Sequence, residues 1–300
     1  MAKWFKTSLY YLSLLLGTAI ASFLLFHILP ADPARVALGP YASQQSVDSL
    51  RHELGLDLPP AQQFLHQMRS LAKGDLGKSF VDGRSVATMV LERFRTTASI
   101  GLTATMLAFL VSFLVNAAAD RWPNWGWLIE SGRFASHFPS FVLAILGALA
   151  VSAVFPAVSL GGAGFFSSMM LAAVLAAVHP AAFMSMHLRK QIQSQRLAPH
   201  YRAARASGQT GWQLFRRHLL RPSSVAWLAA LVNQLGILFF TVILIELTFS
   251  IPGVGTLLLQ SIQRSDFPTL QGLILVNASL FVFLAIMAEV VYELVDPRLR

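Results

Sequence analysis

The longest uncharged stretch of the chain, from Phe134 to Leu188, reads FASHFPSFVLAILGALAVSAVFPAVSLGGAGFFSSMMLAAVLAAVHPAAFMSMHL. These 55 residues contain no Asp, Glu, Lys or Arg. One helix crosses a bilayer core with about 20 apolar residues, so the stretch is too long for a single span. Pro156 and the GGAG cluster at 161–164 divide it, because proline and glycine are typical of turns. The stretch therefore predicts two membrane-spanning helices, at 135–156 and 165–187.

Four further stretches without charged residues, each long enough to cross a bilayer, lie at 8–29, 96–119, 222–245 and 267–288. Together with the central stretch, they predict an all-α integral membrane protein with six transmembrane helices. The expected spans are 8–29, 97–119, 135–156, 165–187, 223–246 and 270–294. The chain then divides into a tail and first helix (1–29), a polar segment (30–96) and a five-helix core (97–300).

The composition supports this fold class. Hydrophobic residues make up 55% of the chain and charged residues 12%, and the mean hydropathy is +0.59. A soluble domain usually has about 25% charged residues, so this chain cannot cover a globule with charge. Cysteine is absent, which excludes a disulfide framework and a thiolate metal site.

The first apolar run has an alternative interpretation. Lys3 and Lys6 precede it, as basic residues precede the apolar part of a secretory signal peptide. The run is longer than the roughly 7–15 residues of such a peptide, and no suitable cleavage site closely follows it. We therefore expect an uncleaved first span.

The distribution of basic residues predicts the orientation. With both termini inside, the cytoplasmic segments 1–7, 120–133, 188–221 and 295–300 hold 14 of the 23 Lys and Arg residues. Segment 30–95 has eight basic and seven acidic residues, but long loops count little in the positive-inside rule. We therefore expect a multi-pass membrane protein with both termini in the cytoplasm.

The net charge of +9 is concentrated in one predicted cytoplasmic loop. Segment 188–221 has eight Lys and Arg residues and no acid. So localised a charge does not indicate a nucleic-acid surface, and we expect no nucleic acid as a partner. Contact with lipid phosphate is one explanation of the loop. Docking of an acidic protein surface is the other.

The middle of this loop, HYRAARASGQT at 200–210, favours docking. Its alanines are strong helix formers, and Gly208 is placed to end the helix. Thr210 can cap a second helix, which leads to Pro222 at the start of the fifth span. Small alanines let another surface approach closely, and the arginines beside them suit carboxylates. Lipid contact alone would not need this arrangement.

RAARASG, at 202–208, resembles the cytoplasmic loop of binding-protein-dependent ABC transporter permeases, which has the pattern E-A-A, three residues, Gly. It is closer to the RTARAKG of the dipeptide, oligopeptide and nickel branch, with Ala203 for Thr and Ser207 for the basic residue. Three more stretches resemble the same branch: LPADPARVALG with LRHELGLDLPPAQQF and GDLGKSF, ELTFSIPGVGTLLLQSIQRSDFPTLQG, and YELVDPRLR. The Pro expected in the fifth span is replaced by Ala226.

The resemblance implies the fold of a type I ABC importer permease, which works with a homologous second permease, two cytoplasmic ATPase subunits and a periplasmic solute-binding protein. Its substrates would be dipeptides or oligopeptides, with nickel or a metal–chelator complex as the alternative. The loop 188–222 would dock on the ATPase. By resemblance, the ATPase-coupling residues are Arg202, Ala203, Ala204, Arg205 and Gly208.

The chain itself contains no G-x-x-x-x-G-K-[ST] phosphate-binding motif, so ATP hydrolysis is expected in separate subunits. We expect a transport subunit that is not an enzyme and has no cofactor. An intramembrane enzyme would need paired aspartates, Ser with Lys, or H-E-x-x-H in the spans, and these are absent. A channel or ion-coupled carrier, the third class, would need no coupling loop.

Two further regions carry hypotheses. The external segment contains SQQSVDSLRHELGL (43–56), in which apolar residues recur at helical spacing and Ser46 is a candidate cap. We expect it to meet the binding protein, and a merely solvated loop is the alternative. Within the spans, Glu246 and His179 are candidates for a gate or the solute pathway. No two histidines lie four residues apart in a span, so we expect no metal site.

Overall fold

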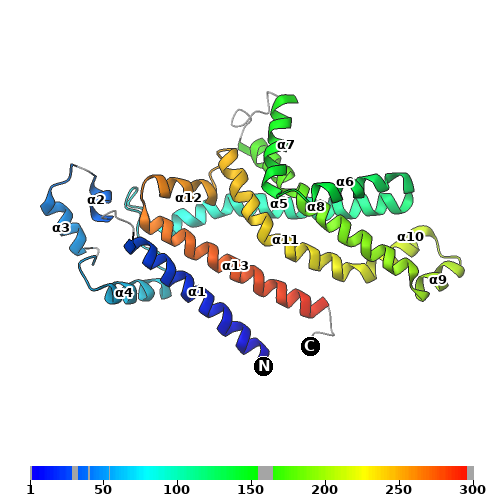
Figure 1. Cartoon of the computed structure of the whole chain (residues 1–300), viewed down its shortest axis with the longest axis horizontal. Coiled ribbons are helices and arrows are strands. Elements are labelled where there is room, and N and C mark those ends of the chain that lie inside the picture. Colours follow the sequence, from blue (N-terminus) through cyan, green and yellow to red (C-terminus); the bar gives the residue numbers. More distant parts are fainter. Residues whose placement is uncertain (1, 29–32, 40, 54, 155–164, 296–300) are drawn as a thin grey trace. The chain divides into compact units, whose positions relative to one another are not determined.

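The computed structural model describes residues 2–28, 33–39, 41–53, 55–154 and 165–295. The described part is almost entirely helical, as predicted, and its only strand-like pairing is a single bridge between Lys78 and Ser85. The chain forms two compact units (Figure 1). Unit 1 comprises residues 1–96 and 252–283, and unit 2 comprises residues 97–251 and 284–300.

Two long helices run through both units: α5 (Val86–Arg121) and α13 (Phe267–Val295). The other helices of unit 1 are α1 (Ala2–Ile28), α2 (Pro33–Leu38), α3 (Gln44–Glu53), α4 (Pro60–Ala72) and α12 (Val254–Gln263). The other helices of unit 2 are η1 (Pro123–Gly126), α6 (Trp127–Ala135), α7 (Ser140–Val154), α8 (Phe165–Leu197), α9 (Pro199–Ala206), α10 (Gly211–Leu214), η3 (Phe215–Leu220) and α11 (Arg221–Thr248).

In the part of the chain that the structure describes, five helical stretches are long and apolar enough to cross a membrane: 6–24, 86–121, 167–197, 211–248 and 267–291. They agree with five of the six predicted spans. Three are much longer than expected, since α5 begins at Val86, α8 ends at Leu197 and the stretch that contains α11 begins at Gly211. The spans were predicted from uncharged stretches, and such stretches mark only the part of a helix that lies in the bilayer. The helix itself can continue into water with charged side chains on it.

The predicted helix at 135–156 differs from the structure. α6 ends at Ala135, where the predicted helix begins, and the apolar helix α7, 15 residues long, starts only at Ser140. Pro139 lies directly before α7 and has no N–H to continue the helix from the α6 side. At 15 residues, α7 is shorter than the about 20 that a perpendicular span needs. The turn expected at Pro156 and 161–164 lies outside the described residues.

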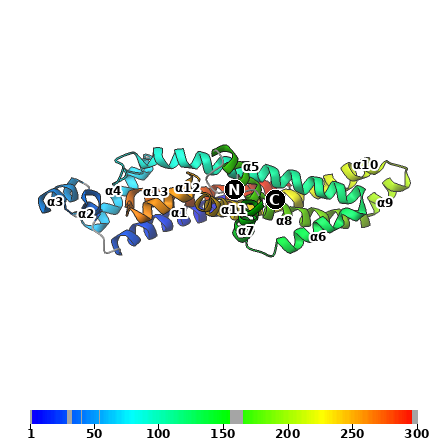
Figure 2. The ribbon, with the colours of Figure 1, turned by 90° about the horizontal axis from the view of Figure 1, so that it is seen from above.

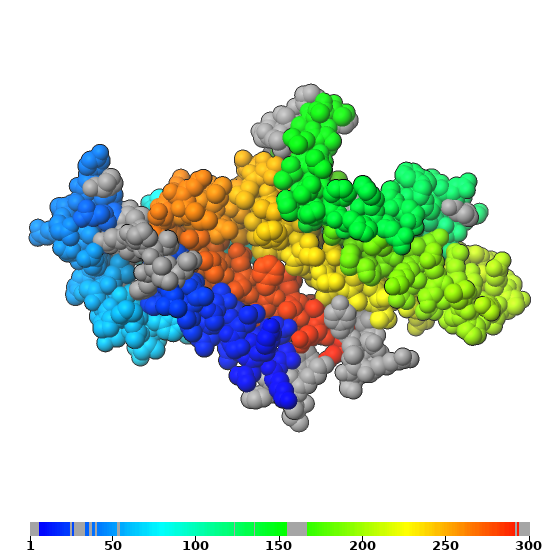
Figure 3. Space-filling view, viewed as in Figure 1, coloured from blue at the N-terminus to red at the C-terminus, as the bar shows by residue number. Residues whose placement is uncertain are grey.

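Unit 2 is built around α8, which packs against α6, α7 and α11 (Figure 2). The buried face of α8 is rich in alanine, and small side chains bring the helices close together. At Gly147 of α7, a Cβ atom would lie 2.5 Å from Leu175 of α8. Beyond this contact α7 projects from the unit (Figure 3). The close packing fixes the helices that lead into the basic segment.

The stretch from Gly211 to Thr248 is one continuous helix, because a widened π turn, Phe215–Leu220, joins α10 to α11. Pro222 follows this turn as the second residue of α11. A proline ring inside a regular helix clashes with the carbonyl four residues earlier, here that of His218. The wider turn accommodates the ring. The prediction of Pro222 at the start of the fifth span is confirmed, and the helix also extends upstream of it.

Unit 1 contains a polar contact between two distant loops. Asp266 is buried, and its carboxylate accepts hydrogen bonds from Ser79 Oγ (2.5 Å), Phe80 N (3.1 Å) and Thr269 Oγ1 (2.7 Å). Ser79 Oγ also accepts from the backbone N–H groups of Val81 and Asp82. Loop 74–85 is therefore fastened to the loop between α12 and α13, 187 residues away in the sequence.

The helical patch expected in the external segment is confirmed as α3, and its Val47 is fully buried. The predicted cap at Ser46 is wrong. Ser46 lies inside the helix, and its N–H donates to the Oγ of Ser43, 3.2 Å away. Ser43 precedes the first helical residue, Gln44, and satisfies an N–H that the helix itself leaves free.

The turn between α3 and α4 contains an exposed ion pair, in which His52 Nδ1 lies 2.6 Å from Asp57 Oδ2. The hydrogen bond to Asp57 raises the pKa of His52, and the same bond lowers the pKa of Asp57. The stabilisation from His52 is fully present below the pKa that His52 has in the unfolded chain, and it is lost as the pH rises through the higher pKa of the folded chain. The stabilisation from Asp57 is present above the pKa that Asp57 has in the unfolded chain, and it is lost as the pH falls through the lower pKa of the folded chain.

We expect Asp57→Asn to lower the titration midpoint of the His52 ring, because the variant keeps the shape of the side chain and removes its charge. Histidine ring signals in selectively labelled protein, followed by NMR across pH 5–9, measure this midpoint. Asp48→Asn, which removes the carboxylate paired with Arg51, is the matched control and should leave it unchanged. An unchanged midpoint in Asp57→Asn would show that the pair does not form in solution.

Candidate functional site

The candidate coupling segment, residues 199–210, consists of α9 and the turn that follows it, and it has two distinct faces. Tyr201 and Ala204 point inward, where Tyr201 packs on the core of unit 2 and Ala204 is 7% exposed. Arg202, Ala203 and Arg205 are exposed. Of the five residues expected to couple, Ala204 thus belongs to the face that holds the helix on its own unit. The other four, Gly208 included, are free to meet a partner.

The end of α9 and the start of α10 follow the local sequence signals. Gly208 has φ +78°, a left-handed conformation that glycine adopts without strain. Thr210 then caps α10, as predicted, since its Oγ1 accepts from Gln213 N while Gln213 Oε1 accepts from Thr210 N. This reciprocal pair satisfies two backbone donors at the helix start. The turn is therefore held rigidly by its own residues.

Polar and aromatic contacts connect the candidate coupling segment to the π turn Phe215–Leu220. His218 Nε2 lies 3.1 Å from Gln209 Oε1, and the rings of His200 and His218 are 6.1 Å apart. Phe215 and Leu219 are buried below them. A force applied to α9 would therefore reach the start of α11 through packed side chains as well as through the backbone.

The outward surface of this region is strongly basic. Segment 188–221 contains no acidic residue, and its exposed cations are Lys190, Arg202, Arg205, Arg216, Arg217 and Arg221. Guanidinium groups on a small-residue surface can form paired hydrogen bonds with carboxylates while the backbones approach closely. The geometry suits rigid docking on an acidic protein groove. Among the described residues, no group of three His, Cys, Asp or Glu side chains could hold a metal ion.

Glu246 and His179, the gate candidates, are both buried inside unit 2. The Oγ1 of Thr97 on α5 donates to Glu246 Oε1 at 2.5 Å, and Glu246 is fully buried near the end of α11. His179 is 9% exposed and lies beside Gln234 of α11 and the backbone of Ser136. Its Nδ1 has no hydrogen-bond partner among the described residues. Pro180 follows it inside α8.

Two polar contacts were not predicted from the sequence. Asp120, at the end of α5, forms an ion pair with Arg196 of α8, and Asp266 fastens loop 74–85 in unit 1. Both join residues far apart in the chain, so no local pattern signals them. Asp266 does lie in a stretch that resembles the permease branch, SIQRSDFPTLQG, and this was the one available indication.

The family described as binding-protein-dependent transport system inner membrane component matches residues 133–300, more than half of the chain. The N-terminal region typical of the same transport components matches residues 5–101. The two matches together cover most of the chain and leave residues 102–132 between them.

Relatives match along almost the whole length. A protein of Brucella abortus (strain 2308), named as a peptide transport system permease, is 30% identical over 298 residues, 95% of each chain. A glutathione transport system permease of Escherichia coli is 30% identical over 285 residues, 94% of this chain and 93% of the relative. The crystal structure of an amino acid ABC transporter with histidines is 13% identical, with a TM-score of 0.53 over 69% of this chain and 94% of that one, and so shares the fold.

Proposed function

This chain belongs to the family of inner-membrane components of binding-protein-dependent transport systems, and we propose that it is the permease subunit of an ATP-driven importer of peptides. It is a transport subunit of a multi-pass inner-membrane system and not itself an enzyme. The relatives named for peptide and glutathione transport support a peptide substrate, and they do not favour nickel.

The proposed coupling to an ATPase rests on one observation: the outward surface of α9 is exposed and has no acidic residue. Since this chain has no phosphate-binding motif, energy must enter from an ATPase subunit. We assign Arg202, Ala203, Arg205 and Gly208 to direct contact with that subunit, and Ala204 to holding α9 on unit 2. Movement of the ATPase would then reach α8 and α11, the helices that flank the segment.

The proposed assembly contains this chain, a homologous second permease, two ATPase subunits and a periplasmic solute-binding protein. Both termini and α9 would face the cytoplasm, in accord with the positive-inside rule. Segment 30–96 would face the periplasm and contact the binding protein. Substrate would pass between helices of the two permeases by alternating access.

The pathway roles of Glu246 and His179 stay predictions. Both are buried by helices of this same chain, where Glu246 bonds Thr97 of α5 and His179 lies beside Gln234 of α11. We infer that they act on transport through the packing of α5, α8 and α11. A helix movement that separated these pairs would expose them to the solute.

The test is uptake in a deletion strain in which the transporter genes are restored. Labelled di- and oligopeptides, including glutathione, are offered in parallel with nickel and nickel–chelator complexes. We expect peptide uptake that disappears when the phosphate-binding Lys of the partner ATPase is replaced by Ala. Uptake of metal alone would overturn the peptide assignment, and uptake that survives the ATPase mutation would overturn the coupling mechanism.

A further inference from the structure

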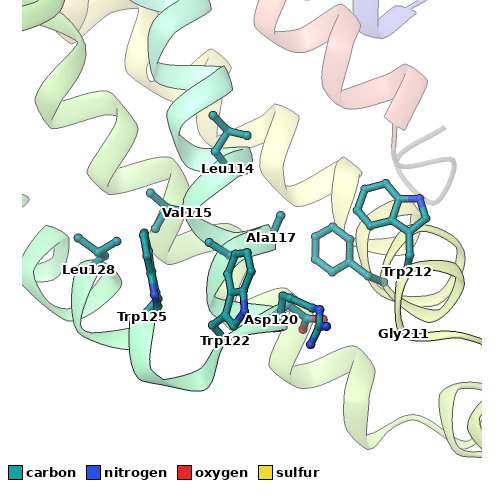
Figure 4. Close-up of a pocket in the computed structure, with 12 residues that line it drawn as sticks. Leu114, Val115, Ala117, Asp120, Trp122, Trp125, Leu128, Gly211 and Trp212 are labelled. Carbon is teal, nitrogen blue, oxygen red and sulfur yellow. The ribbon is translucent and has the colours of Figure 1, made fainter.

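An open cleft of about 910 Å³ lies in unit 2, at the end of α5. Its walls come from three parts of the chain: the end of α5, η1 with α6, and the start of α10 (Figure 4). Its lining residues include Leu114, Arg121, Trp122, Trp125, Leu128 and Trp212. The volume lies within the roughly 300–1,000 Å³ of ordinary ligand sites.

The cleft lies at the ends of two helical stretches that are long and apolar enough to cross a membrane. One ends at Arg121, and the other, which extends upstream of the predicted fifth span, begins at Gly211. Tryptophan gathers at the boundary between a bilayer and water, where its ring meets both apolar chains and polar headgroups. Trp122, Trp125 and Trp212 are 54%, 50% and 57% exposed, so about half of each side chain is not covered by the described residues.

The charge beside the cleft has an excess of cations. Asp120 is the one acid among the described lining residues, and Arg196 already pairs with it. Arg189 lies close enough to interact electrostatically with both. Among the described residues, no hydrogen-bond partner reaches the buried Nη1 of Arg189 or the buried Nε of Arg196. Arg121 lines the same cleft as Asp120, so these residues comprise three arginines and one carboxylate, and an anion would balance the charge.

We propose that this cleft binds an acidic phospholipid of the cytoplasmic leaflet, of the phosphatidylglycerol type. Its phosphodiester would interact with Arg121, close to the positive charges of Arg189 and Arg196. Its acyl chains would lie along Leu114 and Leu128, over the tryptophan rings. A soluble acidic peptide fits less well, because its carboxylates would have to enter the apolar boundary where the spans end. Lipid supplies the anion and the apolar chains in one molecule.

The site adjoins the candidate coupling segment. Gly211 and Trp212 line the cleft and directly follow Thr210, the residue that caps α10. A bound lipid would therefore hold the start of α10, which directly follows that segment, against α5. This consequence rests on the proposed function, whereas lipid binding itself does not.

Native mass spectrometry of the transporter complex, purified with equal amounts of phosphatidylglycerol and phosphatidylcholine, measures the lipid retained. We expect the wild type to retain phosphatidylglycerol preferentially. Arg121→Gln should reduce this preference about fivefold, which corresponds to the roughly 1 kcal/mol contributed by one basic residue near an anionic surface. Arg121→Lys keeps the charge and should retain the preference. Trp212→Ala should reduce total lipid retention by weakening the apolar wall.

Arg216→Gln is the matched control, because Arg216 is exposed on the same basic segment but does not line the cleft. It should leave the preference unchanged. Equal retention of the two lipids by the wild type would overturn the proposal. Equal effects of Arg121→Gln and Arg216→Gln would also overturn it, since they indicate diffuse attraction. So would crosslinking of a photoreactive residue at position 212 to a protein subunit instead of lipid. The assay uses neither ATP nor peptide, so its outcome is independent of transport.

Discussion

Gly208→Asp is expected to reduce peptide uptake by more than tenfold, while the chain still inserts into the membrane. Gly208 is exposed, and a Cβ atom added there would meet no other atom within 4 Å. Its φ of +78° is a conformation that Asp and Asn tolerate better than other side chains. The isolated subunit should therefore fold normally. The loss arises because the new carboxylate would face an ATPase groove that matches a basic surface.

Gly208→Asn is the matched control, since it has nearly the same shape as Asp without the charge. We expect its uptake to stay within about threefold of the wild type, a difference smaller than 1 kcal/mol. Gly208→Val should fall between the two, because a left-handed conformation costs an ordinary side chain roughly 1–2 kcal/mol. Co-purification of the ATPase with the permease should follow the same order as uptake.

Two results would contradict this account. Equal uptake in Gly208→Asp and Gly208→Asn would show that the charge of the docking surface does not matter. Normal uptake in Gly208→Asp would remove Gly208 from the interface altogether. In either case, membrane levels of each variant must first be compared with the wild type by immunoblotting, because a poorly inserted subunit would also lose uptake.

The features that the sequence predicted correctly are those governed by neighbouring residues. The cap at Thr210 and the left-handed Gly208 depend on a few adjacent positions, and both are present in the structure. The apolar spans follow from hydropathy, a sum over about 20 residues. Ser46 shows the limit of such signals, because Ser43 could cap the same helix and only the actual helix start decided between them.

The features missed depend on distant residues. Ala204 was expected on the docking face, yet it is buried, because the direction in which α9 faces is set by the core beneath it. The start of α7 at Ser140, five residues later than predicted, follows Pro139, and the effect of a proline on a helix boundary is a tendency and not a rule. Trp122 and Trp125 lie near the end of α5, and the cleft that they share with Trp212 depends on a residue about 90 positions away, which no local pattern shows.

The largest effect on stability is expected for Asp266→Ala in unit 1. The substitution leaves three donors without their acceptor: Ser79 Oγ, Phe80 N and Thr269 Oγ1. A buried polar group left unsatisfied costs about 1–3 kcal/mol, so the attachment of loop 74–85 should lose on the order of 3 kcal/mol or more. Loop 74–85 should then open far more often than in the wild type.

Trypsin cleavage after Lys78, an exposed residue of that loop, measures the opening in purified transporter. We expect Asp266→Ala to be cut at least tenfold faster than the wild type, and Ser79→Ala, which removes one of the three donors, to be cut at an intermediate rate. Asp82→Asn is the matched control. Asp82 lies 3.8 Å from Arg264 with both side chains exposed, and such surface pairs contribute at most about 1 kcal/mol.

If Asp82→Asn and Asp266→Ala were cut at the same rate, the buried carboxylate would not be what fastens the loop. The same variants also separate fold from function. Since segment 30–96 is proposed to meet the binding protein, Asp266→Ala should weaken stimulation of the ATPase by loaded binding protein. Asp82→Asn should leave that stimulation unchanged. Cleavage without any loss of stimulation would keep the structural role of Asp266 and move the docking surface elsewhere.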